Sequence, residues 1–270
     1  MIPGTRAGRT PGVFADLERV AELLRERGGE LGREVRLFAE IDSTNDEAKR
    51  CAKSGAAHGT VFVAESQTRG RGRQGRSWVS PRGENLLFSV LLRLTCAPAR
   101  LPPLALVCGL AVRDAILRAA PKSGALVKWP NDVLIDRKKV SGVLVEATLS
   151  GTRVDAVIVG IGINVHTREL PDELGARATS VALHAEAPAD RASILADVIA
   201  GLDRDLSHVA ARGLGLVHAR LSAADALIGS RVTLEECAGI ARGIDLEGRL
   251  LLDRDDGTRV RISSGEVTLA

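Results

Sequence analysis

The sequence contains no tyrosine, and aromatic residues make up only 2% of its 270 residues. Because 45% of the residues are still hydrophobic, we expect a sizeable core that is packed mainly with Val, Leu, Ile and Ala. The length favours one large domain, or a large domain together with a small one.

Long hydrophobic runs and paired cysteines are also missing. No apolar run approaches the roughly 18 residues that a membrane-spanning helix needs, and residues 1–12 lack the apolar segment of a signal peptide. The histidines are scattered and no Cys-x-x-Cys pair occurs, which argues against a zinc site. We therefore predict a cytoplasmic protein with no membrane partner, in which the cysteines are free thiols: Cys51, Cys96, Cys108 and Cys237.

Neither sign of charge dominates the chain. Lys and Arg together number 37 against 34 Asp and Glu, which leaves a net charge of +3. This balance gives no case for a protein that binds nucleic acid through its overall charge, so any basic function must be local.

The spacing of apolar residues predicts the elements of a main domain. Helices are expected over residues 15–27, about 44–54, 104–120 and 190–211. Short runs rich in Val, Leu and Ile predict strands over residues 35–38, 60–64, 86–94, 126–129, 133–135, 142–149 and 154–161. Before the second helix, Ser43 with Asp46 and Thr44 with Glu47 both have the spacing of a capping box.

A smaller unit begins near Ile228, where short strands alternate with glycine-containing turns. This rhythm is typical of a small β-barrel, with strands over residues 231–234, 237–244, 249–252, 258–262 and 267–269. A barrel of roughly 40 residues is marginal alone and should dock on the main domain. We therefore divide the chain into a disordered tail (1–14), a main domain (15–222) and a small barrel (223–270).

A loop over residues 65–78 carries four arginines within eight residues, Arg69, Arg71, Arg73 and Arg76, with glycines between them. Exposed backbone N–H groups and guanidinium groups together can wrap an anion. A solvated basic loop, or a segment that touches RNA, is the alternative for such a stretch taken alone.

Three nucleotide-binding motifs do not explain this loop. Gly70-x-Gly72-x-x-Gly75 matches the dinucleotide-binding string, but the chain then runs through Pro81 and Gly83 into a strand, where that motif requires a helix. The string also occurs in protein kinases, but neither His-Arg-Asp nor Asp-Phe-Gly follows. No Gly-Lys-Ser/Thr is present, so there is no P-loop.

Further motifs follow this loop in a fixed order. They are Lys128-Trp129-Pro130-Asn131-Asp132, Lys139, Gly142-Val143-Leu144-Val145-Glu146 and Gly160-Ile161-Gly162-Ile163-Asn164-Val165, with Ser43-Thr44-Asn45 upstream of the loop. In content and order, residues 36 to 165 resemble the catalytic domain of biotin–protein ligases. The resemblance extends to the C-terminal unit, where Ala241-Arg242-Gly243-Ile244-Asp245 and Gly265-Glu266-Val267 are similar to the family's small barrel.

This resemblance implies both a fold and a reaction. The fold is α+β, a class II synthetase-like catalytic domain with a mixed sheet flanked by helices, plus a small C-terminal SH3-like β-barrel. The reaction is the ATP-dependent, Mg²⁺-dependent activation of biotin to biotinyl-5′-AMP, followed by transfer of biotin to a lysine of a biotin carboxyl carrier protein of acetyl-CoA carboxylase. ATP and biotin are then substrates.

The resemblance also implies which residues form the site. Arg71, Arg73 and Lys139 are the candidates for catalysis, because cations over the reacting phosphorus offset the repulsion between biotin carboxylate and ATP. The biotin site is expected to comprise Ser43, Thr44, Asn45, Gln67, Gly70, Arg71, Gly72, Arg73, Lys139 and Gly142. The ATP site is expected to comprise Arg73, Arg76, Trp78, Lys128, Asn131, Asp132, Lys139 and Asn164. No metal ligands are assigned.

Two of these assignments have a structural alternative. Ser43 and Thr44 can cap the helix that they begin, and one can cap while the other faces the ligand. Asp132 can orient a lysine or help to hold Mg²⁺, or it can accept backbone N–H bonds in its turn.

The chain departs from the family in three places. About 35 residues precede the first expected strand, fewer than a winged helix needs, so we expect a monofunctional enzyme that does not bind operator DNA. Gln74 stands where some members carry a further arginine. No tryptophan occurs in Arg177-Ala178-Thr179-Ser180, near where some members close over the adenine.

Two rival functions and two further expectations remain. A lipoate–protein ligase shares the fold and chemistry but is expected to lack the arginine-glycine loop, and a nucleic-acid-binding protein would use that loop as a basic patch. We expect residues 66–80 to be disordered without ligand and to order over the water-sensitive intermediate. An exposed strand edge beside the site could serve a homodimer or dock the acceptor.

Overall fold

The computed structural model describes residues 16–94, 97–150, 153–170, 175–234 and 237–269. The tail predicted over residues 1–14, and Cys96, lie outside the described residues. Among the described cysteines, Cys51, Cys108 and Cys237 are free thiols, as predicted.

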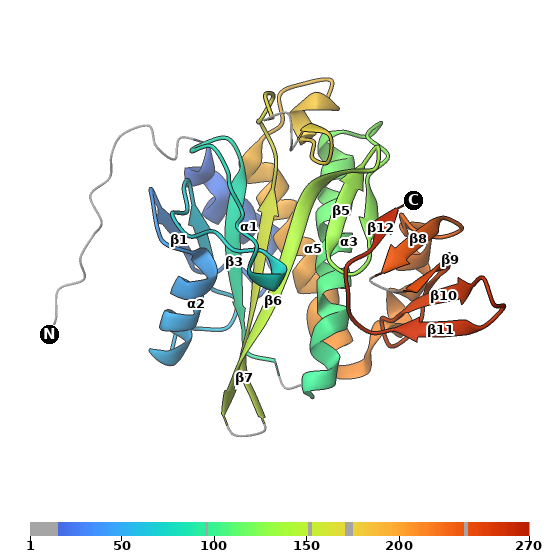
Figure 1. Ribbon diagram of the computed structural model, residues 1–270. Coiled ribbons are helices and arrows are strands. Elements are labelled where there is room, and N and C mark those ends of the chain that lie inside the picture. Colours follow the sequence, from blue (N-terminus) through green and yellow to red (C-terminus); the bar gives the residue numbers. More distant parts are fainter. Residues whose placement is uncertain (1–15, 95–96, 151–152, 171–174, 235–236, 270) are drawn as a thin grey trace, which may run out of the picture.

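A mixed seven-stranded sheet forms the centre of the larger part, which confirms the predicted fold class (Figure 1). Its first two strands are parallel and all the other neighbours are antiparallel. In spatial order the strands are β1 (Val35–Phe38), β2 (Val61–Ala64), β3 (Leu86–Leu92), β7 (Arg153–Ile163), β6 (Lys138–Ser150), β5 (Asp132–Ile135) and β4 (Leu126–Lys128).

Helices cover the two faces of this sheet unequally. One face lies against the helices α1 (Val20–Arg27), α3 (Leu101–Ala119) and α5 (Arg191–Arg212), which share the main hydrophobic core with it (Figure 1). The other face carries α2 (Thr44–Lys53), which packs on β2, β3 and β7 through a separate small cluster. The remaining elements are α6 (His218–Ala223) and the 3₁₀ turns η1 (Leu17–Arg19), η2 (Arg73–Gly75), η3 (Pro98–Arg100), η4 (Val181–Leu183) and η5 (Leu214–Leu216).

The side chains of β7 explain why one face is buried and the other forms a site. Successive side chains of a strand point to opposite faces, so Val157 and Val159 enter the main core while Ala156 and Ile158 pack beneath α2. The next residues on the α2 face are Gly160 and Gly162. Since they carry no side chain, this face has a depression just beyond α2.

Helix α3 begins earlier than the sequence suggested. We placed its start at residue 104, after Pro102 and Pro103, whereas the helix begins at Leu101 and contains both prolines in its first turn. The first N–H groups of a helix have no partner within it, so proline costs little there.

The C-terminal unit is a five-stranded antiparallel sheet, and all five predicted strands are present. Its spatial order is β11 (Arg259–Ile262), β10 (Leu250–Arg254), β9 (Cys237–Ile244), β8 (Arg231–Leu234) and β12 (Thr268–Leu269). Closure into an SH3-like barrel stays a prediction, because β11 and β12 are the two edges of this sheet. The unit lies beside α3 and β5 (Figure 1), and its buried residues belong to the main core.

Candidate active site

One row of residues crosses five strands and forms the floor of a cavity. In the strand register Leu87 pairs with Gly162, Gly162 with Gly142, Gly142 with Asp132, and Asp132 with Lys128. Directly opposed residues share a face, so these five lie in line on the α2 side of the sheet. The floor therefore changes from aliphatic through bare backbone to charged.

The arginine-glycine loop forms the roof of this cavity. The Trp78 N–H donates to Gly70 O over 2.9 Å, and the Gly72 N–H donates to Arg76 O over 2.7 Å, so the loop folds back on itself. Between them lies the turn η2, in which Gln74 has φ 55°, a conformation that is uncommon for residues other than glycine. The loop thereby places Trp78 over the floor.

The indole of Trp78 needs glycine beneath it. A Cβ at Gly162 would lie 2.5 Å from Trp78 Cε2, and one at Gly142 would lie 3.1 Å from Trp78 Cζ3. The first distance is shorter than carbon atoms tolerate, so a side chain at Gly162 would push the indole away, whereas a side chain at Gly142 would require the indole to shift by only a few tenths of an ångström. The loop can approach the sheet this closely because Gly162 carries no side chain.

Uncharged polar groups gather at one end of the cavity. Gln67 Oε1 accepts hydrogen bonds from the Thr44 N–H and hydroxyl, at 2.7 and 3.1 Å. Ser89 Oγ lies 2.7 Å from Thr44 Oγ1 and 2.6 Å from Asn45 Oδ1. Ser43 caps α2 by accepting from the Asp46 N–H, so the expected capping role belongs to Ser43. Thr44, Asn45 and Gln67 are thus held with fixed orientations.

Glu146 ties this end to the loop. Its carboxylate accepts from Asn45 Nδ2 at 2.7 Å, from Lys49 Nζ at 2.6 Å and from Arg71 Nη2 at 3.2 Å. Burial acts to raise the pKa of Glu146, but the hydrogen bonds from Lys49 and Asn45 outweigh it and hold the pKa below the ordinary value. Glu146 is therefore an anion, and it holds Arg71 at the polar end together with Asp46, which lies 2.5 Å away.

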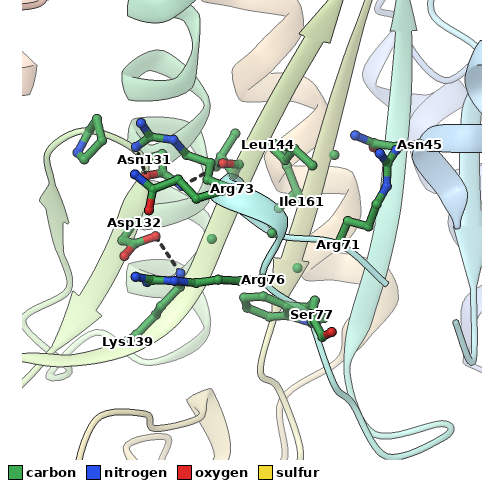
Figure 2. Close-up of a pocket in the computed structure, with 18 of the residues that line it drawn as sticks. Asn45, Arg71, Arg73, Arg76, Ser77, Asn131, Asp132, Lys139, Leu144 and Ile161 are labelled. Carbon is green, nitrogen blue, oxygen red and sulfur yellow. Dashed lines mark hydrogen bonds and ion pairs between the residues drawn. The ribbon is translucent and has the colours of Figure 1, made fainter. Parts of the chain in front are cut away.

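Cationic side chains gather at the other end. Lys139 Nζ lies 2.7 Å from Asp132 Oδ1 and 5.5 Å from the centroid of the Trp78 ring. Arg73 Nη1 donates to Asn131 Oδ1 over 2.9 Å. Burial lowers the pKa of the nearby Lys128. Figure 2 shows Asn131, Asp132 and Lys139 together, separated from Asn45 and Arg71 by Leu144 and Ile161.

The C-terminal unit completes the cationic end. Arg76 forms two hydrogen bonds with the carboxylate of Glu266, and Gly265, Glu266 and Val267 line the cavity. The Arg76 side chain holds the pKa of Glu266 below its ordinary value. The loop is thereby bonded to both structural units.

The structure brings most of the predicted site residues together. All of them line the cavity except Gly70 and Asn164. The Gly70 carbonyl holds Trp78, and Asn164 Nδ2 donates to Thr179 O over 3.0 Å. The individual roles of all these residues remain predictions.

Sequence reasoning missed several contributors. Ser89 and Glu146 form hydrogen bonds with Asn45 at the polar end. The floor also includes Leu87, Leu144, Gly160 and Gly162. The alternation within β3, β6 and β7 was the available signal, because it places these residues on the face opposite the core. Glu146 and the glycines lie within motifs that the sequence had already singled out.

Two negative findings apply to the part of the chain that the structure describes. It contains no group of three or more His, Cys, Asp or Glu residues that could hold a metal ion. None of its helices has the length and hydropathy needed to cross a membrane.

The cavity has the chemistry of a bipolar binding site. One end offers neutral donors and acceptors beside the ion-paired Arg71, the middle is apolar or bare backbone, and the other end is rich in cations. Such a cavity suits a ligand with a neutral polar head, an apolar body and a terminal carboxylate, next to a phosphate-bearing cosubstrate.

Comparison with known sequences gives matches for both structural units. Residues 37–164 match the biotin/lipoate A/B protein ligase family, and residues 227–269 match the biotin protein ligase C-terminal domain. The biotin–[acetyl-CoA-carboxylase] ligase of Mycobacterium tuberculosis is 36% identical over 244 residues, which are 87% of this chain and 88% of that protein. The ligase of the same name from Paracoccus denitrificans is 34% identical over 242 residues, which are 86% and 98% of the two chains.

A solved structure extends these matches to the fold. The biotin protein ligase of Aquifex aeolicus in complex with biotin and ATP superposes with a TM-score of 0.75 and 34% sequence identity, over 88% of this chain and 99% of that one. Sequence, fold and both structural units therefore agree, and the chain belongs to the biotin protein ligases of the biotin/lipoate A/B protein ligase family.

Proposed function

We propose that this protein activates biotin with ATP to biotinyl-5′-AMP and then transfers biotin to a lysine of a carrier protein. The observation that carries this proposal is the bipolar cavity, in which neutral polar groups and cations lie at opposite ends of a glycine floor. The similarity of the chain to a biotin protein ligase whose structure was solved with biotin and ATP supports the same conclusion.

Biotin fits the cavity in one direction. Its neutral ureido ring needs fixed hydroxyl and amide groups, which Thr44, Asn45 and Gln67 supply at the polar end. Its apolar thiophane ring and chain then lie along the glycine floor beneath Trp78. The biotin carboxylate reaches Arg73 and Lys139, where an anion is stabilised.

The first half-reaction joins two anions. A carboxylate oxygen of biotin forms a bond to the α-phosphorus of ATP, and the bond from that phosphorus to pyrophosphate breaks. Arg73 and Lys139 reduce the repulsion during approach and stabilise the charge that develops on the phosphoryl oxygens. Asp132 holds Lys139 in place through its ion pair, the orienting role considered from the sequence.

In the second half-reaction the ε-amine of the acceptor lysine attacks the acyl carbon of biotinyl-5′-AMP. The amide bond forms, AMP leaves with the electrons of the acyl–oxygen bond, and the nitrogen loses a proton to solvent. Because water competes with the amine, the roof formed by Trp78 and its loop protects the intermediate.

Mg²⁺ fits the cationic end as a companion of ATP. Asp132 and Glu266 are carboxylates that line the cavity, and Mg²⁺ commonly takes one or two carboxylates while substrate phosphates supply its other ligands. Asp132 is the group that would hold it, with its carboxylate shared between the ion and Lys139. The ion would neutralise phosphate charge.

A biotin carboxyl carrier protein of acetyl-CoA carboxylase is the proposed acceptor, after the names of the relatives from Mycobacterium and Paracoccus. The same names disfavour lipoate as the substrate. A cytoplasmic location and a homodimer remain proposals.

Biotin-dependent exchange of labelled pyrophosphate into ATP tests the function directly. Arg73→Ala should lower the exchange rate by about 100-fold, because one cation at the reacting phosphate is lost. Arg69→Ala is the matched control, since Arg69 lies in the same loop but outside the cavity and pairs with Asp42. It should leave exchange nearly unchanged.

Substrate specificity and the rival functions are tested in the same experiment. Exchange should require biotin, and lipoate should not replace it. If the folded protein exchanges pyrophosphate into ATP with no small carboxylate, the proposed enzymatic activity is wrong. Tight binding of DNA or RNA at about 150 mM salt would then support the basic-loop alternative.

A further inference from the structure

A buried arginine at the first residue of α5 lies outside the cavity and has not been assigned a role. The side chain of Arg191 is 4% exposed and that of its partner Glu65 is 0% exposed. All five N–H groups of the guanidinium are used: two on Glu65, two on Asp16 and one on the backbone carbonyl of Asn85. Such complete satisfaction fixes the position of the guanidinium.

Two of these acceptors lie at the two ends of residues 65–85, the segment that contains the arginine-glycine loop and is called the ligand loop below. Glu65 directly follows β2 and begins the segment that carries the arginines, and Asn85 directly precedes β3, where the segment ends. Arg191 Nη1 alone donates to both, over 2.7 Å to Glu65 Oε2 and 3.1 Å to Asn85 O. A single nitrogen therefore bridges the entry and exit of the loop.

Further hydrogen bonds hold the two ends of the loop in place. The Gly83 N–H donates to Glu65 O over 3.2 Å, within the segment itself. The Asn85 side chain donates to Ser80 Oγ and accepts from the Val165 N–H, so it links the loop to the end of β7. The distance between the two stems thus depends on groups that meet at Arg191.

The third acceptor comes from the start of the described chain. Asp16 faces Arg191 with both carboxylate oxygens, which accept from Nε and Nη2 at 2.7 Å each, whereas Glu65 accepts from Nη1 and Nη2. Burial acts to raise the pKa of Asp16, but Arg191 outweighs it and holds the pKa below the ordinary value. Arg19 adds an ion pair to Asp190, the residue that caps α5.

We propose that Arg191 is a positioning residue that clamps the two stems of the ligand loop, and that Asp16 holds this clamp from the N-terminal side. The loop carries Arg71, Arg73 and Trp78 into the cavity, so its stems determine where those groups lie. The effect on biotin rests on the proposed function, whereas the effect on the loop does not. The segment before α1 is thereby coupled to the ligand loop.

The geometry explains why lysine cannot replace arginine here. An ammonium group has three donors that radiate from one point, whereas the planar guanidinium reaches two carboxylates and a carbonyl on different sides. Arg191→Lys keeps the charge but must release some acceptors. It therefore loosens the stems without leaving the buried Glu65 and the partly exposed Asp16 wholly uncompensated.

Arg191→Lys should change both loop mobility and kinetics. Trypsin, which cleaves after the loop arginines, should cut residues 69–76 at least about tenfold faster than in the wild type, and biotin should slow both reactions. In the exchange assay the KM for biotin should rise by about tenfold or more, because small displacements of positioned groups are costly. Mass spectrometry identifies the cleavage sites.

Arg220→Lys is the matched control. Arg220, in α6, also binds an aspartate in a two-pronged pair, the buried Asp205 of α5, and neither residue belongs to the ligand loop. It should reduce thermal stability without changing loop cleavage or the KM for biotin. If Arg191→Lys gives the same pattern as this control, Arg191 is only a structural residue and the proposal is wrong.

Asp16→Asn provides the second variant if Arg191→Lys fails to fold. It leaves the pair between Arg191 and Glu65 intact and should speed loop cleavage by a smaller factor, about threefold. Cleavage equal to that of the wild type would overturn the coupling to the N-terminal segment. If the wild type shows no exchange at all, the proposed function fails, and the cleavage rates still decide whether the clamp exists.

Discussion

A substitution at Gly162 should lower activity without lowering stability. A methyl group there would overlap the Trp78 indole, whose atom Cε2 would lie 2.5 Å from the new carbon. In Gly162→Ala the indole and its loop must move, so the exchange rate should fall by about 10- to 100-fold. Thermal stability should hold or rise, because alanine costs about 0.5–1 kcal/mol less than glycine within a strand.

Gly215→Ala is the control for this prediction. Its added Cβ would meet nothing within 4 Å, so exchange should stay at the wild-type level. Full activity in Gly162→Ala would show that Trp78 does not need to lie against the floor. The proposal that Trp78 protects the intermediate from water would then be wrong.

Lys128 is expected to set an alkaline limit on activity. Burial and the neighbouring Lys139 and Arg76 lower its pKa, against Asp132 and Glu266, which raise it, and the net pKa lies below the ordinary lysine value of 10.5. A lowered pKa means that the positive charge is lost earlier as pH rises. We therefore expect kcat/KM for ATP in the exchange assay to fall with an apparent pKa below 10.5.

Lys128→Arg should remove this alkaline limb, because arginine stays protonated throughout the range. Lys138→Arg is the control, since Lys138 binds Gly175 O outside the cavity. The exchange assay contains no acceptor lysine that could titrate in its place. An unchanged limb in Lys128→Arg would assign the titration to another group.

At the scale of the element, Ser43 tests two roles that the sequence left open. Ser43 caps α2 through the Asp46 N–H and also lines the cavity. Ser43→Ala should lower the free energy of unfolding by about 1 kcal/mol, as measured by urea denaturation, because the cap is lost. Ser43→Asn keeps a capping oxygen and should keep most of this stability.

The KM for biotin then reports the second role independently. If the hydroxyl binds biotin, the KM should rise in both variants, whereas a purely capping residue would leave the KM unchanged in Ser43→Asn. The structure already shows Thr44 bonded to Gln67 and facing Ser89, so we expect the second role to be small for Ser43 and large for Thr44.

The elements also show how far sequence reasoning reaches. Apolar spacing located the four long helices and all the central strands, because buried faces impose their period on the sequence. The tight connection from β5 to β6 was missed, since Asp136 and Arg137 adopt φ of 49° and 63° without the Asn-Gly or Asp-Gly signal of such turns. As a result β6 begins at Lys138 and places Lys139 within the strand.

In the site, too, residues within contiguous motifs were predicted from the sequence, whereas contacts between distant residues were not. Resemblance of motifs identified the loop and the Lys128–Asp132 turn, which are contiguous in sequence. It did not identify Ser89, whose hydroxyl contacts Thr44 and Asn45 only because β3 lies beneath α2. Nor did it identify the Arg191 contacts, which join residues more than 100 positions apart. Such pairs depend on tertiary packing.

At the scale of the whole molecule, the two structural units share one core and one hydrogen-bonded seam. The buried side chains of Val232, Leu250 and Leu252 belong to the same cluster as the residues of α3. The Val127 N–H donates to Ala224 O, and the Ala226 N–H donates to Val127 O. The segment that leads into the smaller unit therefore pairs with β4. We therefore expect the units to unfold together.

Trp129 reports directly on this seam. Its side chain is 1% exposed, and Nε1 donates to Gly248 O of the smaller unit over 3.0 Å. Trp78→Phe leaves Trp129 as the only tryptophan in the chain. In that variant the urea transition followed by fluorescence should coincide with the transition followed by far-ultraviolet circular dichroism.

The alternative outcome is equally informative. A fluorescence change at lower urea would mean that the small unit undocks first, while the central sheet stays folded. The contact between Arg76 and Glu266 would then open with it, and the loop would lose its tether at the cationic end. Coincident transitions instead imply that a fold-wide core, rather than that exposed ion pair, keeps Gly265, Glu266 and Val267 in the cavity, since exposed ion pairs contribute at most about 1 kcal/mol.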